Sequence, residues 1–286
     1  MRGVVVLSPS RYSLYTTCIT GLLLRRGIQV RAVYVRRLLN LNRLLSEFSR
    51  DGFRLFRKIW KKALLRERAY KAEGFDTIVD LMRRENIAPR KVSDFRKQYG
   101  IPVVYCRTLN DEIVVEGLKR IRPDVVVFTG GGLIRKDVLM NSGAGVLNCH
   151  MGVLPDYRGM DVIEWAILEG RINHVGITIH FMDEGIDTGD IVRSRTIAVQ
   201  DCESIQQLRD RFEPIMCLEM VEACTSFFQG NLERAPQRLG DGKQYFTMHP
   251  RLTRLAEMRL KGFLGRSPAS GKAAWGWAGE DRPFGP

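Results

Sequence analysis

Short runs of consecutive apolar residues, each followed by a turn and a stretch with helical periodicity, most constrain how this chain can fold. Val4–Leu7 and the strand-like run Asp124–Thr129 (DVVVFT) show no polar alternation, as expected for strands covered on both faces. The first run is followed by a predicted helix, Tyr12–Arg26, and a second predicted strand, Ile28–Tyr34. A strand–helix–strand opening predicts an α/β fold with an open, mostly parallel, doubly wound sheet.

The same alternation continues along the chain and divides it into segments. Further strands are predicted at Ile101–Tyr105, Val146–His150, His174–Phe181 and Asp190–Val199, and helices at Asp76–Asn86, Val92–Tyr99, Asp111–Arg120 and Val162–Glu169. We therefore expect a sheet domain over residues 1–200. A long helix ending near Gly230 and another over Leu252–Lys261 predict a helical C-terminal extension, 201–261. Residues 262–286 hold six glycines and three prolines and are predicted to be a disordered tail.

Composition excludes several classes of protein. The 286 residues are 44% hydrophobic and 27% charged, and no apolar run approaches the roughly 20 residues that span a bilayer. Met1–Gly3 lead directly into the first predicted strand, so no signal peptide is expected. The six cysteines show no Cys-x-x-Cys spacing, which favours reduced thiols and a cytoplasmic protein.

The net charge of +13 is concentrated in one segment. Residues 25–71 carry 15 lysines and arginines against three acidic residues. Residues 38–73, which largely overlap this segment, are predicted to be a helical insertion, with Phe53, Phe56 and Trp60 at helical spacing on one face and basic residues on the other. This helix can pack on the core with a solvated basic face, lie on an anionic membrane, or contact a polyanion. No motif for sequence-specific nucleic-acid recognition is present.

The stretch Val146–Ile191 carries the residues best suited to chemistry. Asn148 and His150 are two residues apart on a predicted strand, so their side chains lie on the same face. Asp187 belongs to an acidic, glycine-punctuated loop that follows the strand ending at Phe181. Because open α/β sheets place their sites at the carboxyl ends of strands, we expect an amide, an imidazole and a carboxylate to meet at the carboxyl ends of neighbouring strands.

Four motifs in this region resemble the N-formyltransferase family, whose members use 10-formyltetrahydrofolate as formyl donor. The motifs are Asn148-Cys149-His150, Leu154-Pro155-Asp156-Tyr157-Arg158-Gly159, Gly176-Ile177-Thr178 and Asp187-Thr188-Gly189. The family includes phosphoribosylglycinamide, methionyl-tRNA and sugar-nucleotide N-formyltransferases. Weaker similarity extends from residue 76 to about 200. The resemblance implies a formyltransferase-type sheet and a one-carbon transferase.

The resemblance also implies which residues act. Asn148, His150 and Asp187 match the positions of the three catalytic residues. In the amine's attack on the formyl group, an amide can donate to the developing oxyanion, and an imidazole held by a carboxylate can manage the amine's proton. Each residue has a structural alternative, namely a strand-end cap, a buried histidine and a turn.

The resemblance implies that two loops bind the folate and that two other segments bind the amine substrate. The expected folate contacts are Gly130, Gly131, Gly132, Leu133, Ile134, Asp183, Glu184 and Gly185; a glycine triplet is also typical of a tight turn. The expected substrate contacts are Ser10, Arg11, Tyr157, Arg158 and Gly159. Ser8, Ser10 and Arg11 sit at a predicted helix N-terminus, where they can bind an anion or simply cap the helix.

Two further features of the region allow more than one interpretation. His180 shares a strand face with Thr178, so it either lines the site or packs in the core. The acidic loop lacks the spacing of a calcium loop and has no Cys or His pair of the kind zinc prefers, so no metal is expected.

The acceptor implied by the resemblance is a primary amine, with a small or nucleotide-linked amino sugar as first choice. Methionyl-tRNA is an alternative, although those enzymes carry a C-terminal β-barrel and residues 201–286 look helical and then glycine-rich. Hydrolysis of formyltetrahydrofolate is a second alternative. A non-catalytic protein bound to anionic surfaces by its basic helix is a third. The sequence does not fix the oligomeric state.

Overall fold

The computed structural model describes residues 3–37, 77–130, 132–200, 202–238 and 240–264. The basic helical insertion predicted over 38–73 lies outside the described residues, as does most of the tail predicted for 262–286.

The described elements follow the predicted alternation of strands and helices. In chain order they are β1 (Val4–Ser8), α1 (Leu14–Arg25), β2 (Val30–Arg36), α4 (Ile78–Arg84), α5 (Asp94–Tyr99), β3 (Val103–Cys106), α6 (Glu112–Ile121), β4 (Val125–Phe128), α7 (Lys136–Met140), β5 (Val146–His150), β6 (Tyr157–Gly159), α8 (Val162–Leu168), the 3-10 helix η1 (Ile172–His174), β7 (Gly176–Phe181), β8 (Ile191–Thr196), α9 (Ile205–Gln229), β9 (Lys243–Tyr245) and α10 (Pro250–Leu264).

The main sheet has seven strands in the order β3-β2-β1-β4-β5-β7-β8. The pairs from β3 through β5 are parallel, whereas β7 runs antiparallel to both β5 and β8. Strand order reverses between β1 and β4, the arrangement of a doubly wound sheet. The predicted mostly parallel α/β fold is therefore confirmed.

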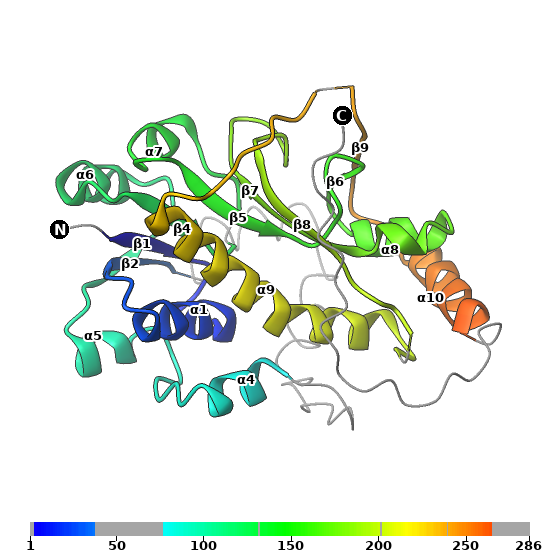
Figure 1. Cartoon of the computed structure of the whole chain (residues 1–286), viewed down its shortest axis with the longest axis horizontal. Coiled ribbons are helices and arrows are strands. Elements are labelled where there is room, and N and C mark those ends of the chain that lie inside the picture. Colours follow the sequence, from blue (N-terminus) through cyan, green and yellow to red (C-terminus); the bar gives the residue numbers. More distant parts are fainter. Residues whose placement is uncertain (1–2, 38–76, 131, 201, 239, 265–286) are drawn as a thin grey trace, which may run out of the picture.

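Both faces of the sheet are covered by helices, which explains the unbroken apolar runs. Val4 and Val6 belong to the core beneath α1 and α9, while Val5 and Leu7 belong to the core beneath α6 and α7. Figure 1 shows these two helical layers on opposite sides of the sheet. Consecutive side chains of β1 thus point to opposite faces, and all are fully buried.

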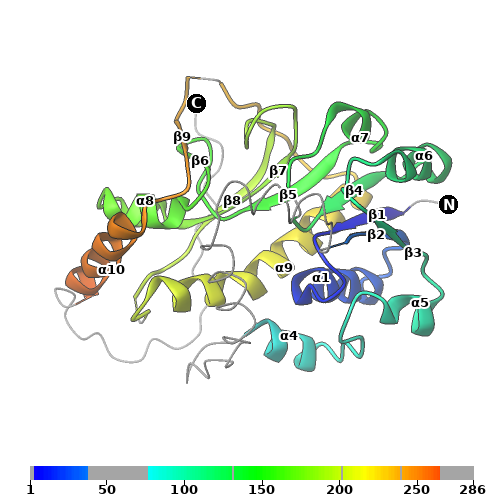
Figure 2. The ribbon, with the colours of Figure 1, turned by 180° about the vertical axis from the view of Figure 1, so that it is seen from behind.

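The helical C-terminal region packs against the sheet domain. The 25-residue helix α9 lies along α1 and contacts β5 and β7, and α10 packs on α8 (Figure 2). Glu219 of α9 is buried and pairs with Arg195 at 2.7 Å and Arg193 at 3.2 Å, both from β8. None of the helices in the described ranges is both long and apolar enough to cross a membrane.

A second, two-stranded sheet joins residues far apart in sequence. The three residues of β9 pair in parallel with β6, from Tyr157 opposite Lys243 to Gly159 opposite Tyr245. The rings of Tyr157 and Tyr245 stack at 5.1 Å, and the hydroxyls of both donate to Glu169. The segment after α9 is therefore fixed to β6, which borders the site described below.

Gly117 of α6 is required by the closeness of β2. A Cβ atom there would lie 1.7 Å from the hydroxyl oxygen of Tyr34, which is 1% exposed. We expect Gly117→Ala to lower the free energy of unfolding by about 1–3 kcal/mol, as overpacking does, measured by urea denaturation. Adding Tyr34→Phe removes the obstructing oxygen and should recover part of the loss; a double variant no more stable than Gly117→Ala would contradict this explanation.

Candidate active site

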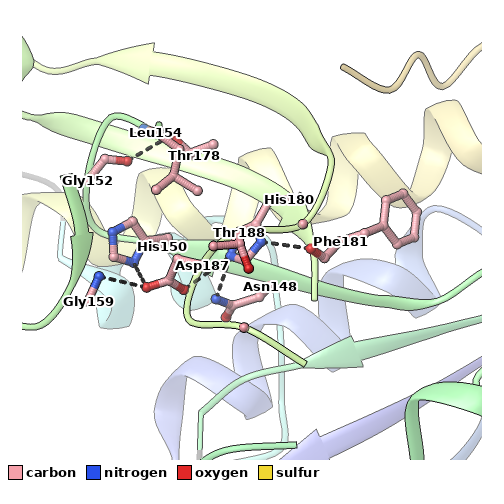
Figure 3. A network of polar contacts seen from close by, with 12 residues as sticks. Asn148, His150, Gly152, Leu154, Gly159, Thr178, His180, Phe181, Asp187 and Thr188 are labelled. Carbon is pink, nitrogen blue, oxygen red and sulfur yellow. Dashed lines mark hydrogen bonds and ion pairs between the residues drawn. The ribbon is translucent and has the colours of Figure 1, made fainter. Parts of the chain in front are cut away.

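The register of β5 and β7 brings four polar side chains onto one face of the sheet. Asn148 lies opposite His180, and His150 lies opposite Thr178. All four are half-buried or buried. His180 therefore joins the predicted pair from β5, as Figure 3 shows.

The route by which Asp187 reaches this face differs from the prediction. We expected neighbouring strands to meet at their carboxyl ends, but β7 is antiparallel to β5, and its last residue, Phe181, pairs with Leu147. The loop after β7 therefore starts near the amino end of β5 and folds back toward His150, at the carboxyl end. Asp187 adopts a left-handed backbone conformation, φ +54°, in this loop.

Asp187 is the centre of the resulting cluster (Figure 3). One carboxylate oxygen, Oδ2, lies 3.3 Å from Nδ1 of His150 and accepts a hydrogen bond from the backbone N–H of Gly159 at 2.9 Å. The other, Oδ1, lies 3.4 Å from Nε2 of His180. Burial raises the pKa of Asp187, but His180 and His150, which lie beside its two carboxylate oxygens, outweigh this effect, so its pKa is below the usual value. The carboxylate is therefore ionised at neutral pH.

His150 is surrounded by hydrogen-bond acceptors. Its Nε2 lies 2.8 Å from the carbonyl oxygen of Tyr157, and its Nδ1 faces Asp187. A neutral imidazole can donate to only one of the two, whereas an imidazolium can donate to both. Burial nevertheless lowers the pKa of His150 below its ordinary value, against the opposing effects of Asp187 and the Tyr157 carbonyl. The ring is thus neutral at rest. If it takes up a second proton, both of its N–H groups have an acceptor.

The amide of Asn148 is oriented by His180. The Phe181 carbonyl oxygen lies 2.8 Å from Nδ1 of His180 and accepts its hydrogen. In the neutral ring Nε2 is then an acceptor, and the NH₂ of Asn148 lies 3.0 Å from it. An amide has two N–H donors, so the second remains to be offered to a ligand. Within the described residues no group of His, Cys, Asp and Glu side chains is arranged to hold a metal ion.

Thr178 fixes the loop that follows β5. Its hydroxyl donates to the carbonyl of Gly152 at 2.7 Å and accepts from the backbone N–H of Leu154 at 3.1 Å. A Cβ atom on Gly152 would lie 2.7 Å from Nε2 of His150, so this loop packs directly against the imidazole. Thr178 therefore holds one wall of the His150 site.

We expect Thr178→Val, which keeps the shape but removes the hydroxyl, to destabilise the fold. It leaves the Gly152 carbonyl and the Leu154 N–H without their partner, at about 1–3 kcal/mol for each buried group. Thermal or urea unfolding measures the loss. Thr178→Ser retains the hydroxyl and should recover most of it. Equal stability of the valine and serine variants would contradict a hydrogen-bonding role.

The motif Tyr157-Arg158-Gly159 contributes to the cluster through its backbone. The Tyr157 carbonyl faces His150, and the Gly159 N–H binds Asp187. The side chains of Tyr157 and Arg158 are buried, the first against Tyr245 and the second with its guanidinium donating to the carbonyl of Gly242. Their part in substrate binding stays a prediction.

The two loops predicted to bind folate lie side by side. Lys136, just after the glycine-rich loop, pairs with Glu184 of the acidic loop at 3.8 Å. Gly130 and Gly132 have φ of +104° and +108°, so these positions need glycine for their backbone conformation. Among the residues that the structure describes, a Cβ atom at either would lie at least 3.7 Å from any side chain beyond its chain neighbours. Leu133 is 69% exposed, Ile134 is buried, and Gly131 lies outside the described residues.

The carboxylate of Asp183 organises the acidic loop itself. It accepts hydrogen bonds from the hydroxyl of Thr188 and from the N–H of Gly185. A Cβ atom on Gly185 would lie 2.0 Å from the Thr188 hydroxyl, so the turn is closed there. Asp183 and Gly185 thus shape the loop that carries Asp187.

The segment holding Ser10 and Arg11 connects β1 to α1 at the point where strand order reverses. Ser13 caps α1 by accepting from Thr16 N–H, so the expected capping by Ser8 or Ser10 was wrong. Ser8 instead begins a buried chain of hydroxyls that continues through Thr16 to Thr129. Arg11 is exposed.

Sequence reasoning missed Gln237, which follows α9 by eight residues. Its Nε2 donates to the backbone carbonyls of the first and last residues of the Asp187-Thr188-Gly189 turn, at 3.2 Å to Asp187 and 2.5 Å to Gly189. No periodicity marks this segment, so only the three-dimensional structure places it beside the cluster.

Comparison with known proteins places the chain in a family. Residues 70–222, more than half of the chain, match the family described as formyl transferase. The chain therefore belongs to the formyl transferase family, which confirms the resemblance seen in its motifs.

Among relatives, methionyl-tRNA formyltransferase of Chlorobium phaeovibrioides is 29% identical over 181 residues, covering 62% of this chain and 55% of that protein. Methionyl-tRNA formyltransferase of Geotalea daltonii is 31% identical over 156 residues, covering 54% and 50%. The chain spans about half the length of these relatives.

Solved structures share the fold at low sequence identity. The N-formyltransferase of Helicobacter canadensis, solved with folinic acid and dTDP-3-aminofucose, has a TM-score of 0.54 at 13% identity, covering 91% of this chain and 81% of that one. Glycinamide ribonucleotide transformylase 1 of Symbiobacterium toebii has a TM-score of 0.53 at 19% identity, covering 83% and 94%.

Proposed function

We propose that this protein transfers a formyl group from 10-formyltetrahydrofolate to a primary amine. The observation that carries the proposal is the convergence of Asn148, His150 and Asp187 in one polar cluster. It occurs in a chain that belongs to the formyl transferase family. The folate, when bound, supplies the formyl carbon that the amine attacks.

Asn148 stabilises the oxygen on which negative charge develops during this attack. Its amide is held by His180 and cannot lose its donors by titration. A donor oriented before the reaction needs no reorganisation when the charge appears, and a single such donor is worth about 100- to 1000-fold in rate.

His150 and Asp187 manage the proton that the amine must lose. His150 is neutral at rest, because burial lowers its pKa. When it takes a proton, both ring nitrogens donate, one to Asp187 and one to the Tyr157 carbonyl. The negative charge of Asp187 stabilises the imidazolium that forms.

The arrangement of the two predicted loops fits a folate donor. Gly130, Gly132, Leu133 and Ile134 on one side and Asp183, Glu184 and Gly185 on the other would hold it, with Gly131 between the first two in sequence. The exposed apolar side chain of Leu133 and the open backbone at Gly132 offer a surface to a flat ring.

The acceptor we propose first is a nucleotide-linked or other small amino sugar. The Helicobacter canadensis neighbour, which was solved with such a sugar, shares the fold over 91% of this chain. Methionyl-tRNA is the second candidate, because methionyl-tRNA formyltransferases are similar in sequence to about half of the chain.

Donor turnover tests the function and separates these candidates. The purified protein is incubated with 10-formyltetrahydrofolate and, in separate arms, with nucleotide-linked amino sugars, methionyl-tRNA or no amine. Release of tetrahydrofolate is followed by absorbance and the formylated product by mass spectrometry. His150→Gln serves as the matched inactive control.

Each outcome points to one function. Product in a sugar arm or the tRNA arm identifies the acceptor class. Tetrahydrofolate released equally without amine indicates a hydrolase. No turnover in any arm, or equal turnover by His150→Gln, contradicts the proposal and favours a binding protein.

A further inference from the structure

Gln237 forms hydrogen bonds to the backbone of the turn that contains Asp187. The two carbonyls it binds, those of Asp187 and Gly189, flank Thr188. Because both partners are acceptors, only the NH₂ end of the amide can face them, and this fixes the orientation of the side chain. The turn is thereby held through its backbone, whereas His150, His180 and Gly159 contact the Asp187 carboxylate.

The turn needs such a support. Asp187 has a positive φ, which is unfavourable for a residue with a Cβ atom. Gly189 is pressed against β7, since a Cβ there would lie 2.0 Å from the Phe181 carbonyl. The loop must also turn back across an antiparallel pair to reach His150. A small relaxation of the turn would withdraw the carboxylate from both histidines.

Gln237 is itself anchored to the sheet. Ala235 forms an antiparallel bridge with Ile191, the first residue of β8, through two backbone hydrogen bonds of 2.8 Å. Arg234 donates to the carbonyl of Ala144 just before β5. The segment 234–237 is therefore held on both sides of the loop that it supports, and it lies beyond the residues that match the family.

Stability alone does not account for this amide. The Oε1 atom of Gln237 is buried and has no hydrogen-bond partner among the described residues. A buried acceptor without a partner costs free energy that an apolar side chain of equal length avoids. The amide does, however, supply the two hydrogen bonds to the turn.

We propose that Gln237 is a positioning residue that holds Asp187 against His150 and His180. It acts through the backbone of the 187–189 turn and does not touch the reacting atoms. The inference builds on the proposed formyl transfer, but its first test is independent of any activity.

The test is the titration of His150 followed by NMR. The chain has four histidines, so the resonance is assigned with His150→Gln. The titratable groups facing Asp187 are His150 of β5 and His180 of β7. Because Asp187 raises the pKa of His150, its withdrawal in Gln237→Met should shift the titration to lower pH, toward that of Asp187→Asn.

Gln206→Met is the matched control. Gln206 is exposed on α9 and its amide donates to Asp210, so the same chemical change removes a hydrogen bond remote from the turn. It should leave the His150 titration as in the wild type. Gln237→Asn, one methylene shorter, should shift the titration less than methionine and provides the answer if Gln237→Met does not fold.

An unchanged His150 titration in folded Gln237→Met or Gln237→Asn would overturn the proposal. In the kinetic arm, Gln237→Met should lower kcat by about 10- to 100-fold with little change in the KM of the donor, as expected for misplacement of a catalytic group. If the wild type turns over no donor with any amine, the proposed function fails while the NMR result still decides the role of Gln237.

Discussion

Replacement of Asp187 by asparagine is expected to reduce kcat for formyl transfer by roughly 1000- to 10,000-fold, as when a carboxylate that orients a catalytic imidazole is neutralised. Asparagine preserves the shape and tolerates the left-handed conformation at this position, φ +54°. The change therefore removes the charge beside His150 and leaves the turn in place. Single-turnover kinetics with saturating donor measures the chemical step directly.

The same variant has a second expected effect, on pH dependence. Asp187 raises the pKa of His150 and burial lowers it, so loss of the carboxylate leaves the lowering effect unopposed. The acidic limb of the kcat/KM profile should move to lower pH than in the wild type. A variant within tenfold of wild-type kcat would show that Asp187 is a turn residue and not part of the reaction.

His150→Gln is expected to lower kcat by about 100- to 10,000-fold, the range for loss of a positioned acid–base group. Glutamine can still donate to Asp187 or to the Tyr157 carbonyl, but it cannot take up a proton near neutral pH. In the wild type, burial holds the pKa of His150 below its ordinary value, so the loss of activity with falling pH should lie on the acidic side of neutrality.

The variant should lose this acidic limb altogether, since the titrating group is gone. A rate–pH profile from pH 5 to 9 for both proteins provides the measurement. Persistence of the limb in His150→Gln would assign the titration to another group. His174→Gln, which changes the histidine of η1 beside Asp156, is a control expected to leave the profile unaltered.

Several parts of the fold could be predicted because the pattern is local. The apolar runs of β1 and β4 directly reflect burial on two faces, and their neighbours in the sheet bear this out. Asn148 and His150 share a face because side chains alternate along any strand. Such features need only a few adjacent residues.

The path by which the loop brings Asp187 to His150 could not be predicted from the residues around Asp187. An antiparallel β7 reverses the end at which the loop begins, and nothing in its residues distinguishes the two directions. The pairing of β9 with β6 joins three-residue strands, and β9, whose first two residues are exposed, shows no alternation that would mark it as a strand. Gln237 lies in an irregular segment and acts through carbonyl groups, which every residue has.

The pairing of β6 with β9 affects the stage of synthesis at which the candidate active site can be completed. The contacts that tie residues 157–159 to 243–245 span more than 80 positions, so they form only after the ribosome has released most of the chain. Until then β6, whose backbone groups face His150 and Asp187, lacks its pairing with β9. We expect a nascent polypeptide ending before Gln237 to contain most of the sheet yet leave the imidazole and carboxylate imperfectly aligned.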